Sequence, residues 1–306
     1  MNFAIEASHL SKKFGDTQAV ADVTFQVTNG EIFGLLGPNG AGKTTTIRLM
    51  LDIFKPDSGS VSILDGPMTE MKKERIGYMP EERGLYQEMK LERCLIYLAG
   101  LKGISAPEAR QRLNHYLERF DLAQHKNKKV KELSRGMQQK AQIINTVLHQ
   151  PELLIVDEPF SGLDPVNTQL VKELMNELRT EGTTIIMSTH MMHQVEELCD
   201  RILLINKGRN VLYGPLNEIR RSYAGHAVHV RVDGPLPHMD GILSVEQHNS
   251  VTQLTLDSGT SPQDVLAQLV GNHVNIEQFE IATPTLDEIF IRAVKEDVAP
   301  VEVGNV

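Results

Sequence analysis

The chain has 306 residues, of which 41% are hydrophobic and 23% charged, proportions typical of a globular protein rather than a disordered or fibrous one. Its formal net charge of −9 argues against nucleic acid and anionic lipid surfaces as partners. The two cysteines, Cys94 and Cys199, are too few for a disulfide framework and fit a reducing cytoplasm. Because no run approaches the roughly 20 apolar residues that span a bilayer, any membrane association is expected to come through a partner.

The first 36 residues are predicted to form strands. Short apolar runs alternate there with the turn dipeptides Gly15-Asp16 and Asn29-Gly30. The runs that we expect to be strands are Phe3–Ile5, Ala19–Val27 and Ile32–Leu36.

A helical block is predicted between Leu91 and about His149, where leucines recur at helical spacing and no strand-like run occurs. Short apolar runs separated by helix-length segments then return over Leu153–Val156, Thr183–Ser188 and Arg201–Ile205. This alternation indicates parallel strands joined by helices. The sequence therefore predicts an α/β fold in which a helical insertion interrupts a central parallel sheet.

A second, smaller domain is predicted after a break near Gly214-Pro215. The pattern there predicts strands over Val228–Val232, Leu243–Gln247, Val251–Leu256 and Val274–Ile281, and helices over Pro262–Val270 and Leu286–Val294. We expect a larger domain over residues 1–215, a small α+β domain over residues 216–297, and a loose tail over residues 298–306.

The segment Gly37-Pro38-Asn39-Gly40-Ala41-Gly42-Lys43-Thr44 matches the phosphate-loop pattern G-x-x-x-x-G-K-[ST] and lies between a predicted strand and a predicted helix. Its glycines allow backbone N–H groups to turn toward phosphates, while Lys43 can reach the β- and γ-phosphates and the Thr44 hydroxyl can bind Mg²⁺. The residues expected to contact the nucleotide here are Gly37, Pro38, Asn39, Gly40, Ala41, Gly42, Lys43, Thr44 and Thr45.

Two acidic residues, Asp157 and Glu158, follow the apolar run Leu153–Val156. Buried strands of this kind deliver side chains at their carboxyl ends. We expect Asp157 to hold Mg²⁺ through water and Glu158 to be the general base that polarises the attacking water. An acidic pair after a strand often only caps a helix, but its occurrence with a phosphate loop favours the catalytic interpretation.

Further motifs follow the phosphate loop along the chain. Leu133-Ser134-Arg135-Gly136-Met137-Gln138 precedes a predicted helix, and Ser161-Gly162-Leu163-Asp164 follows the acidic pair. His190 follows the end of the predicted strand over Thr183–Ser188. Alone, Ser134 would be read as a helix N-cap and His190 as an ordinary strand-end histidine.

In this order, the motifs of residues 1–215 resemble the ATP-binding subunit of an ABC transporter. The resemblance implies a P-loop NTPase with an antiparallel β subdomain and a helical subdomain over about residues 88–150. It also implies that His190 contacts the γ-phosphate, that Phe14 stacks on adenine, and that further nucleotide contacts come from Ser134, Gly136, Met137 and Asp164. In this family the signature of one chain closes on the phosphate loop of another. A second ATPase chain is therefore expected, most simply as a homodimer.

The sequence departs from the family pattern at three positions. Arg135 stands where glycine is usual and Met137 where glutamine is usual, although Ser134 and Gly136 are kept. Glu81 stands where most relatives carry a glutamine that touches Mg²⁺ and relays to the membrane subunit. The expected Mg²⁺ ligands are thus Thr44, Asp157 and Glu81, with the alternative that Glu81 points away from the metal.

The run Tyr78–Tyr86, which contains Glu81, resembles a branch that includes sodium-export and drug-export ATPases. Members of this branch tend to have a small C-terminal domain that ends much like Leu286–Phe290. The resemblance implies an ATPase that drives export through a separate integral-membrane permease, bound peripherally at the cytoplasmic face of the inner membrane. The resemblance does not specify the transported substrate.

The sequence also bears on two other classes of function. A soluble ATP-switched clamp in translation or DNA maintenance usually has two cassettes or a long coiled-coil insertion, and neither is visible in this sequence. A G protein would carry Asn-Lys-x-Asp, but Asn206-Lys207-Gly208 is followed by Arg209. ATP is therefore expected rather than GTP.

Overall fold

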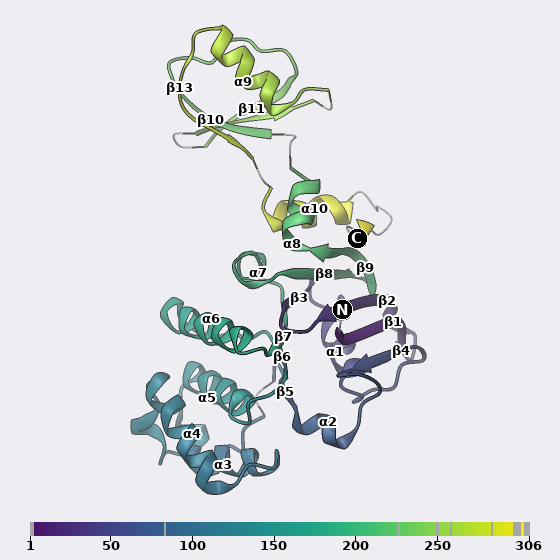
Figure 1. Ribbon diagram of the computed structural model, residues 1–306, viewed down its shortest axis with the longest axis vertical. Helices are drawn as coiled ribbons and strands as arrows, with labels where there is room; N and C mark the ends of the chain where they lie inside the picture. The colour runs from purple at the N-terminus through teal and green to yellow at the C-terminus, as the bar shows by residue number, and fades with distance from the viewer. Residues whose placement is uncertain are drawn as a thin grey trace. The chain divides into compact units, whose positions relative to one another are not determined.

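A computed structural model describes residues 3–82, 84–224, 227–248, 251–257, 259–282, 284–295 and 301–302 (Figure 1). The chain divides into two compact units, and the division falls after Tyr213. Among the described residues, no helix is both long enough and apolar enough to cross a lipid bilayer.

The first unit is built on one mixed sheet with the strand order β4-β1-β2-β9-β8-β3-β7-β6-β5. β3 pairs in parallel with β7 and β8, and β6 pairs in parallel with β5 and β7. β1 instead pairs antiparallel with β2 and β4. The strands are β1 Phe3–Phe14, β2 Thr17–Thr28, β3 Ile32–Leu36, β4 Ser58–Ile63, β5 Ile76–Met79, β6 Leu153–Asp157, β7 Thr184–Thr189, β8 Arg201–Asn206 and β9 Arg209–Pro215.

Helices cover both faces of the parallel strands, which explains why β3, β6 and β7 are buried at every position. Leu153 and Ile155 of β6 share a core with Ile47 of α1. Leu154 and Val156 point the other way and pack with α5 and α6. The helices of this unit are α1 Lys43–Met50, α2 Glu70–Glu74, α3 Leu91–Gly100, α4 Ala106–Arg119, α5 Arg135–Val147, α6 Pro165–Thr180 and α7 Met192–Leu198.

The predicted helical insertion is present as α3, α4 and α5, which lie along the chain between β5 and β6. The antiparallel strands and the parallel strands form one continuous sheet. The predicted α/β fold with an antiparallel part and a helical insertion is thereby confirmed.

The second unit contains an antiparallel sheet in the order β11-β12-β10-β13. Its core joins Val228 and Val230 of β10 and Leu254 of β12 to Val265 and Leu269 of α9. It is an α+β unit, as the sequence predicts. Its elements are α8 Leu216–Ser222, β10 Ala227–Asp233, β11 Ile242–His248, β12 Val251–Leu256, α9 Pro262–Gly271, β13 Asn275–Ile281 and α10 Leu286–Lys295.

Several elements were missed by the sequence analysis. β4 (Ser58–Ile63) is largely polar, β5 (Ile76–Met79) has four residues, and β9 (Arg209–Pro215) carries Gly and Pro at its end. In the expected loose tail, β14 (Val301–Glu302) pairs in parallel with β9. Residues 298–300 and 303–306 of that tail lie outside the described part of the chain.

Candidate functional site

The phosphate-loop segment connects the end of β3 to the start of α1, and two of its glycines are required by close backbone contacts. A Cβ atom at Gly37 would lie 2.2 Å from the Ile205 carbonyl oxygen. One at Gly42, whose φ is +110°, would lie 2.5 Å from the Ala19 carbonyl oxygen. No side chain caps the start of α1, so the N–H groups of its first turn can serve an anion.

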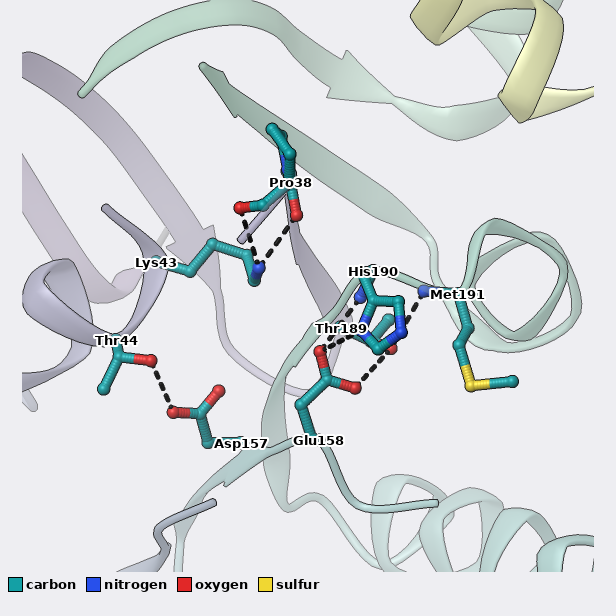
Figure 2. A network of polar contacts seen from close by, with 9 residues as sticks. Pro38, Lys43, Thr44, Asp157, Glu158, Thr189, His190 and Met191 are labelled. Atoms are coloured by element: carbon teal, nitrogen blue, oxygen red, sulfur yellow. Dashed lines mark hydrogen bonds and ion pairs between the residues drawn. The ribbon is translucent and has the colours of Figure 1, made fainter. Parts of the chain in front are cut away.

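Lys43 is the first residue of α1, and its side chain reaches back to the start of this loop. Its ammonium group donates to the carbonyl oxygens of Gly37, at 2.8 Å, and Pro38, at 3.3 Å (Figure 2). Burial lowers the pKa of Lys43 because it removes water from the ammonium group. Three carboxylates act against this shift of the Lys43 pKa, those of Glu158, Asp157 and Glu81.

Thr44 and Asp157 bring two oxygen groups together at the end of β6. The Thr44 hydroxyl donates to Asp157 Oδ2 at 2.9 Å, and the Asp157 side chain is buried (Figure 2). Ser188 is the β7 neighbour of Asp157 and leaves the sheet on the same face. Its buried hydroxyl has no partner among the described residues.

These oxygen donors fit Mg²⁺, which prefers hard ligands and takes only one or two from protein beside phosphates and water. Among the described residues, no cluster of three or more His, Cys, Asp or Glu side chains could hold a metal ion by itself. Two protein oxygens would leave the other positions around a Mg²⁺ ion to water and to phosphate oxygens.

The Glu158 carboxylate is held by the end of β7 (Figure 2). Its Oε1 accepts the backbone N–H of His190 at 3.1 Å and lies 2.7 Å from Nδ1 of the same residue. Its Oε2 accepts the Thr189 hydroxyl at 3.1 Å. The Glu158 backbone has φ = +51° and donates to the Ser188 carbonyl at 2.9 Å. A left-handed conformation of this kind is costly in a non-glycine residue and is typical of functional sites.

The segment that contains Ser134 forms the start of α5. The Ser134 hydroxyl accepts the Met137 N–H at 3.3 Å, so it does act as an N-cap. A Cβ atom at Gly136 would lie 3.3 Å from the Gly162 carbonyl oxygen, which shows that this turn lies against the turn before α6. Asp164 caps α6 by accepting the Asn167 N–H at 2.9 Å, and that contact lowers the pKa of Asp164.

Phe14 ends β1 and has 43% of its surface exposed. Its ring packs edge-on against Phe54, with 5.2 Å between the ring centroids. The Lys12 ammonium lies 5.7 Å from the centre of the Phe14 ring. The exposed part of the ring is free to meet a planar ligand.

Glu81 is exposed in the segment that follows β5, and its charge reaches Lys43. The backbone on both sides of Glu81 is tied to α5, because the buried Gln142 amide donates to the carbonyls of Pro80, at 2.8 Å, and Glu82, at 3.4 Å. Gln139, one turn earlier on α5, donates to the Pro159 carbonyl at 3.1 Å. The segment that contains Glu81 and the segment that contains Glu158 are therefore both anchored to α5, the helix that begins after Ser134.

The structure thus brings Lys43, Thr44, Asp157, Glu158 and His190 together, while Ser134, Gly136, Met137 and Asp164 lie at the starts of α5 and α6. Four further polar residues, which the sequence did not predict, support Glu158 or the segments that contain Glu81 and Glu158, namely Gln139, Gln142, Ser188 and Thr189. For Thr189 a signal existed, since it directly precedes His190 at a strand end. The two glutamines resemble ordinary polar positions of a helix.

The fold and the phosphate-loop site define a P-loop nucleotide hydrolase, and comparisons with known proteins specify the family. The family described as ABC transporter matches residues 20–161, and the C-terminal domain described as ATP-binding protein DrrA1-3-like matches residues 214–294. YhaQ of Bacillus subtilis, an ABC transporter ATP-binding protein, is 44% identical over 289 residues, covering 94% of this chain and 97% of the relative. The chain therefore belongs to the ATP-binding proteins of ABC transporters and is an ATPase of that family.

Two further relatives and one solved structure agree with this assignment. The linearmycin resistance ATP-binding protein LnrL of Bacillus subtilis is 31% identical, over 94% of this chain and 97% of the relative. The Nod factor export ATP-binding protein I of Burkholderia lata is 33% identical, over 87% and 90%. A solved ATP-binding subunit of an ABC transporter superposes with a TM-score of 0.68 at 35% identity, covering 72% of this chain and 93% of that one.

Proposed function

We propose that this ATPase drives export through a separate integral-membrane permease, bound at the cytoplasmic face of the inner membrane. The single observation that carries the catalytic part is the convergence shown in Figure 2, in which Lys43, the Thr44–Asp157 pair and the clamped Glu158 meet at the ends of β3, β6 and β7. Export is supported by relatives whose names refer to Nod factor export and linearmycin resistance.

In this proposal the loop of residues 37–45 binds the phosphates of ATP through its backbone N–H groups and the start of α1. Lys43 now donates to two carbonyls of its own loop, so phosphate oxygens can replace these acceptors without the lysine leaving its place. A charged acceptor makes a stronger hydrogen bond than a carbonyl does. The lysine contact is therefore expected to favour the nucleotide-bound state.

Thr44, Asp157 and Glu81 are the proposed Mg²⁺ residues. The metal ion, when bound, neutralises charge on the phosphates. Thr44 offers its hydroxyl oxygen, and Asp157 holds that hydroxyl in place from the end of β6. Glu81 is included because its charge already reaches Lys43 from the segment after β5.

Glu158 is the proposed general base, which accepts the proton of the attacking water at a carboxylate oxygen. His190 orients this carboxylate through its backbone N–H and its ring nitrogen. The His190 side chain is 57% exposed, so its ring can also turn toward the γ-phosphate. Glu158 would then act on the water and His190 on the phosphate, from the ends of the neighbouring strands β6 and β7.

A second copy of the chain is proposed to complete each site. Ser134, Gly136 and Met137 of one chain would close over the γ-phosphate held by the phosphate loop of the other, with Asp164 beside them. Their placement at the starts of α5 and α6 supports this, because helix starts offer N–H groups to an anion. Phe14, with its partly exposed ring, is the proposed adenine contact.

A groove of about 340 Å³ supports docking of a permease on the first unit. It is lined by Ile53, Met68 and Tyr78, with Lys73 and Lys102 beside them. Ile53 is 54% exposed, and Tyr78 lies in β5, which leads directly to Glu81. A cytoplasmic segment of the permease seated here would contact the same strand that positions Glu81.

The test of the proposed chemistry is Glu158→Gln, which keeps the shape of the side chain but removes its basicity. We expect ATP binding to persist, hydrolysis to fall by roughly a thousandfold or more, and a dimer with trapped ATP to accumulate in size-exclusion chromatography with Mg-ATP. Glu118→Gln, at an exposed position of α4, is the matched control and should behave as the parent chain. A Glu158→Gln protein that stays monomeric or hydrolyses ATP normally would refute the assignment.

A further inference from the structure

Thr189 is a buried residue at the last position of β7, and its hydroxyl makes two hydrogen bonds. The Met191 backbone N–H donates to Thr189 Oγ1 at 3.1 Å. The Thr189 hydroxyl donates to Glu158 Oε2, also at 3.1 Å (Figure 2). The hydroxyl has one proton and an ionised carboxylate can only accept, so Thr189 must donate to Glu158 and accept from Met191.

We propose that Thr189 is a positioning residue that orients the Glu158 carboxylate for hydrolysis. This inference rests on the proposed role of Glu158 as general base. The two carboxylate oxygens are held from different groups, Oε1 by His190 and Oε2 by Thr189. Holding both oxygens determines the plane of the carboxylate, whereas one contact would leave it free to rotate about its terminal bond.

The two contacts differ in their surroundings. The His190 side chain is 57% exposed, whereas Thr189 as a whole is 1% exposed. If the imidazole turns toward the γ-phosphate, Oε1 loses its ring contact and Oε2 keeps the threonine. Thr189 is then the side chain that continues to hold the base in the state that reacts.

The Glu158 backbone makes this support more important. Its φ of +51° is unfavourable for a residue with a Cβ atom, and its N–H is anchored to the Ser188 carbonyl. Three consecutive residues of β7 and its end, Ser188, Thr189 and His190, therefore hold both the backbone and the carboxylate of Glu158. Removing the Thr189 hydroxyl takes away its contact with the carboxylate and the acceptor of the Met191 N–H, but leaves the Glu158 N–H on the Ser188 carbonyl and the His190 N–H on Oε1.

The experiment compares Thr189→Val, which removes the hydroxyl at nearly constant volume, with Thr189→Ser, which keeps it. For Thr189→Val we expect kcat to fall roughly 10- to 100-fold with KM changed by less than about twofold, because the lost bond is to a charged group that acts in the chemical step. Thr189→Ser should keep kcat within about threefold of the parent chain.

Thr184→Val is the matched control. Thr184 is also buried, lies in the same strand, and its hydroxyl accepts the Gly30 N–H at 2.9 Å, away from Glu158. This variant should show a lower melting temperature with unchanged kcat. If Thr189 had only a structural role, Thr189→Val would likewise lower the melting temperature and leave kcat unchanged.

A second readout is the ATP-bound dimer. Thr189→Val should accumulate it in size-exclusion chromatography with Mg-ATP, as Glu158→Gln does, whereas loss of folding would reduce it. Should Thr189→Val fail to fold, Thr189→Ala replaces it in both measurements. A hydroxyl-free variant with the kcat of Thr184→Val, or a Thr189→Ser protein as slow as Thr189→Val, overturns the inference. Normal hydrolysis by Glu158→Gln would instead show that the proposed function itself is wrong.

Discussion

At the scale of single residues, Glu81 is the position where this chain departs most clearly from the family pattern. A glutamine offers a carbonyl oxygen and two N–H groups, but an ionised glutamate only accepts hydrogen bonds. The carboxylate is the stronger ligand for a hard cation such as Mg²⁺. Without the cation, the charge of Glu81 repels the phosphates. Glu81 should therefore strengthen ATP binding when Mg²⁺ is present and weaken it when Mg²⁺ is absent.

We therefore expect ATP binding to depend more steeply on Mg²⁺ in the parent chain than in Glu81→Gln. ATP affinity is measured by calorimetry over a series of free Mg²⁺ concentrations. Glu82→Gln, an exposed neighbour whose backbone contact to Gln142 is unaffected, is the control. Superimposable curves for the parent chain and Glu81→Gln would exclude Glu81 from the metal site, and its role would then be sought in contact with the permease.

His149 is a residue whose ionisation should matter for stability rather than for catalysis. Burial, together with the nearby positive charge of Lys102, lowers the pKa of His149 from 6.5 to about 4. The unfolded chain therefore takes up a proton between about pH 6.5 and pH 4, where the folded chain does not. Stability is lost as the pH falls through this range.

Lowering the pH from 7.5 to 5 should reduce the free energy of unfolding by about 2 kcal/mol through His149. Urea unfolding at both pH values measures this difference. The substitution His149→Gln should remove this part of the loss, because glutamine does not titrate. An equal loss in both proteins would show that His149 does not control the acid sensitivity.

At the scale of elements, α5 connects three parts of the site. It begins after Ser134, and two of its buried amides reach other segments, Gln139 to Pro159 and Gln142 to Pro80 and Glu82. Both acidic segments are thereby held to the helix whose start is proposed to meet the second chain. A movement of α5 would carry these segments with it.

Gln142→Met should release the segment around Glu81, because methionine has a similar length and no N–H donors. We expect faster amide hydrogen exchange at Glu81 and Glu82, unchanged exchange in β6, and a free energy of unfolding lower by about 1–3 kcal/mol. Gln111→Met, at an exposed position of α4, is the matched control. Unchanged exchange at Glu81 and Glu82 would show that Gln142 does not hold this segment.

At the scale of the whole molecule, the division after Tyr213 separates the unit that holds all the proposed nucleotide residues from the α+β unit. We propose that residues 1–215 act as the ATP-binding domain and that residues 216–297 are an accessory domain without catalytic groups. The described part of the second unit contains no phosphate loop and no metal-binding cluster.

A chain that ends at Tyr213 should accordingly bind ATP within about threefold of the full chain, since no nucleotide contact is removed. This is measured by calorimetry after circular dichroism has shown that the shortened chain is folded. A chain that ends at Lys295 is the control, because it loses only the pairing of β14 with β9 among the described contacts of the tail. Loss of ATP binding in a folded chain that ends at Tyr213 would show that residues beyond Tyr213 contribute to nucleotide binding, contrary to the proposal.

Much of the site could be predicted from the sequence because its chemistry depends on neighbouring residues. The phosphate loop is a continuous segment whose glycines are required locally, at Gly37 and Gly42, by close backbone approach. The acidic pair directly follows an apolar run long enough for one buried strand. Spacing along the chain is sufficient to recognise both features. The short or polar strands β4, β5 and β9 lack such a local signal, since their partners, rather than their own periodicity, make them strands.

Only the tertiary structure decided which residues support one another across the chain. The Thr44–Asp157 pair joins residues 113 positions apart, and the contacts of Glu158 with Thr189 and His190 span 31 and 32 positions. These contacts exist because β7 lies between β3 and β6 in the sheet. Periodicity in a sequence reports which face of a strand is buried but not which strand lies beside it. The order of the strands follows from packing the whole sheet between its helices. The contacts of Thr189 with Glu158 and of Gln142 with the segment around Glu81 depend on that packing and could not be predicted from the sequence.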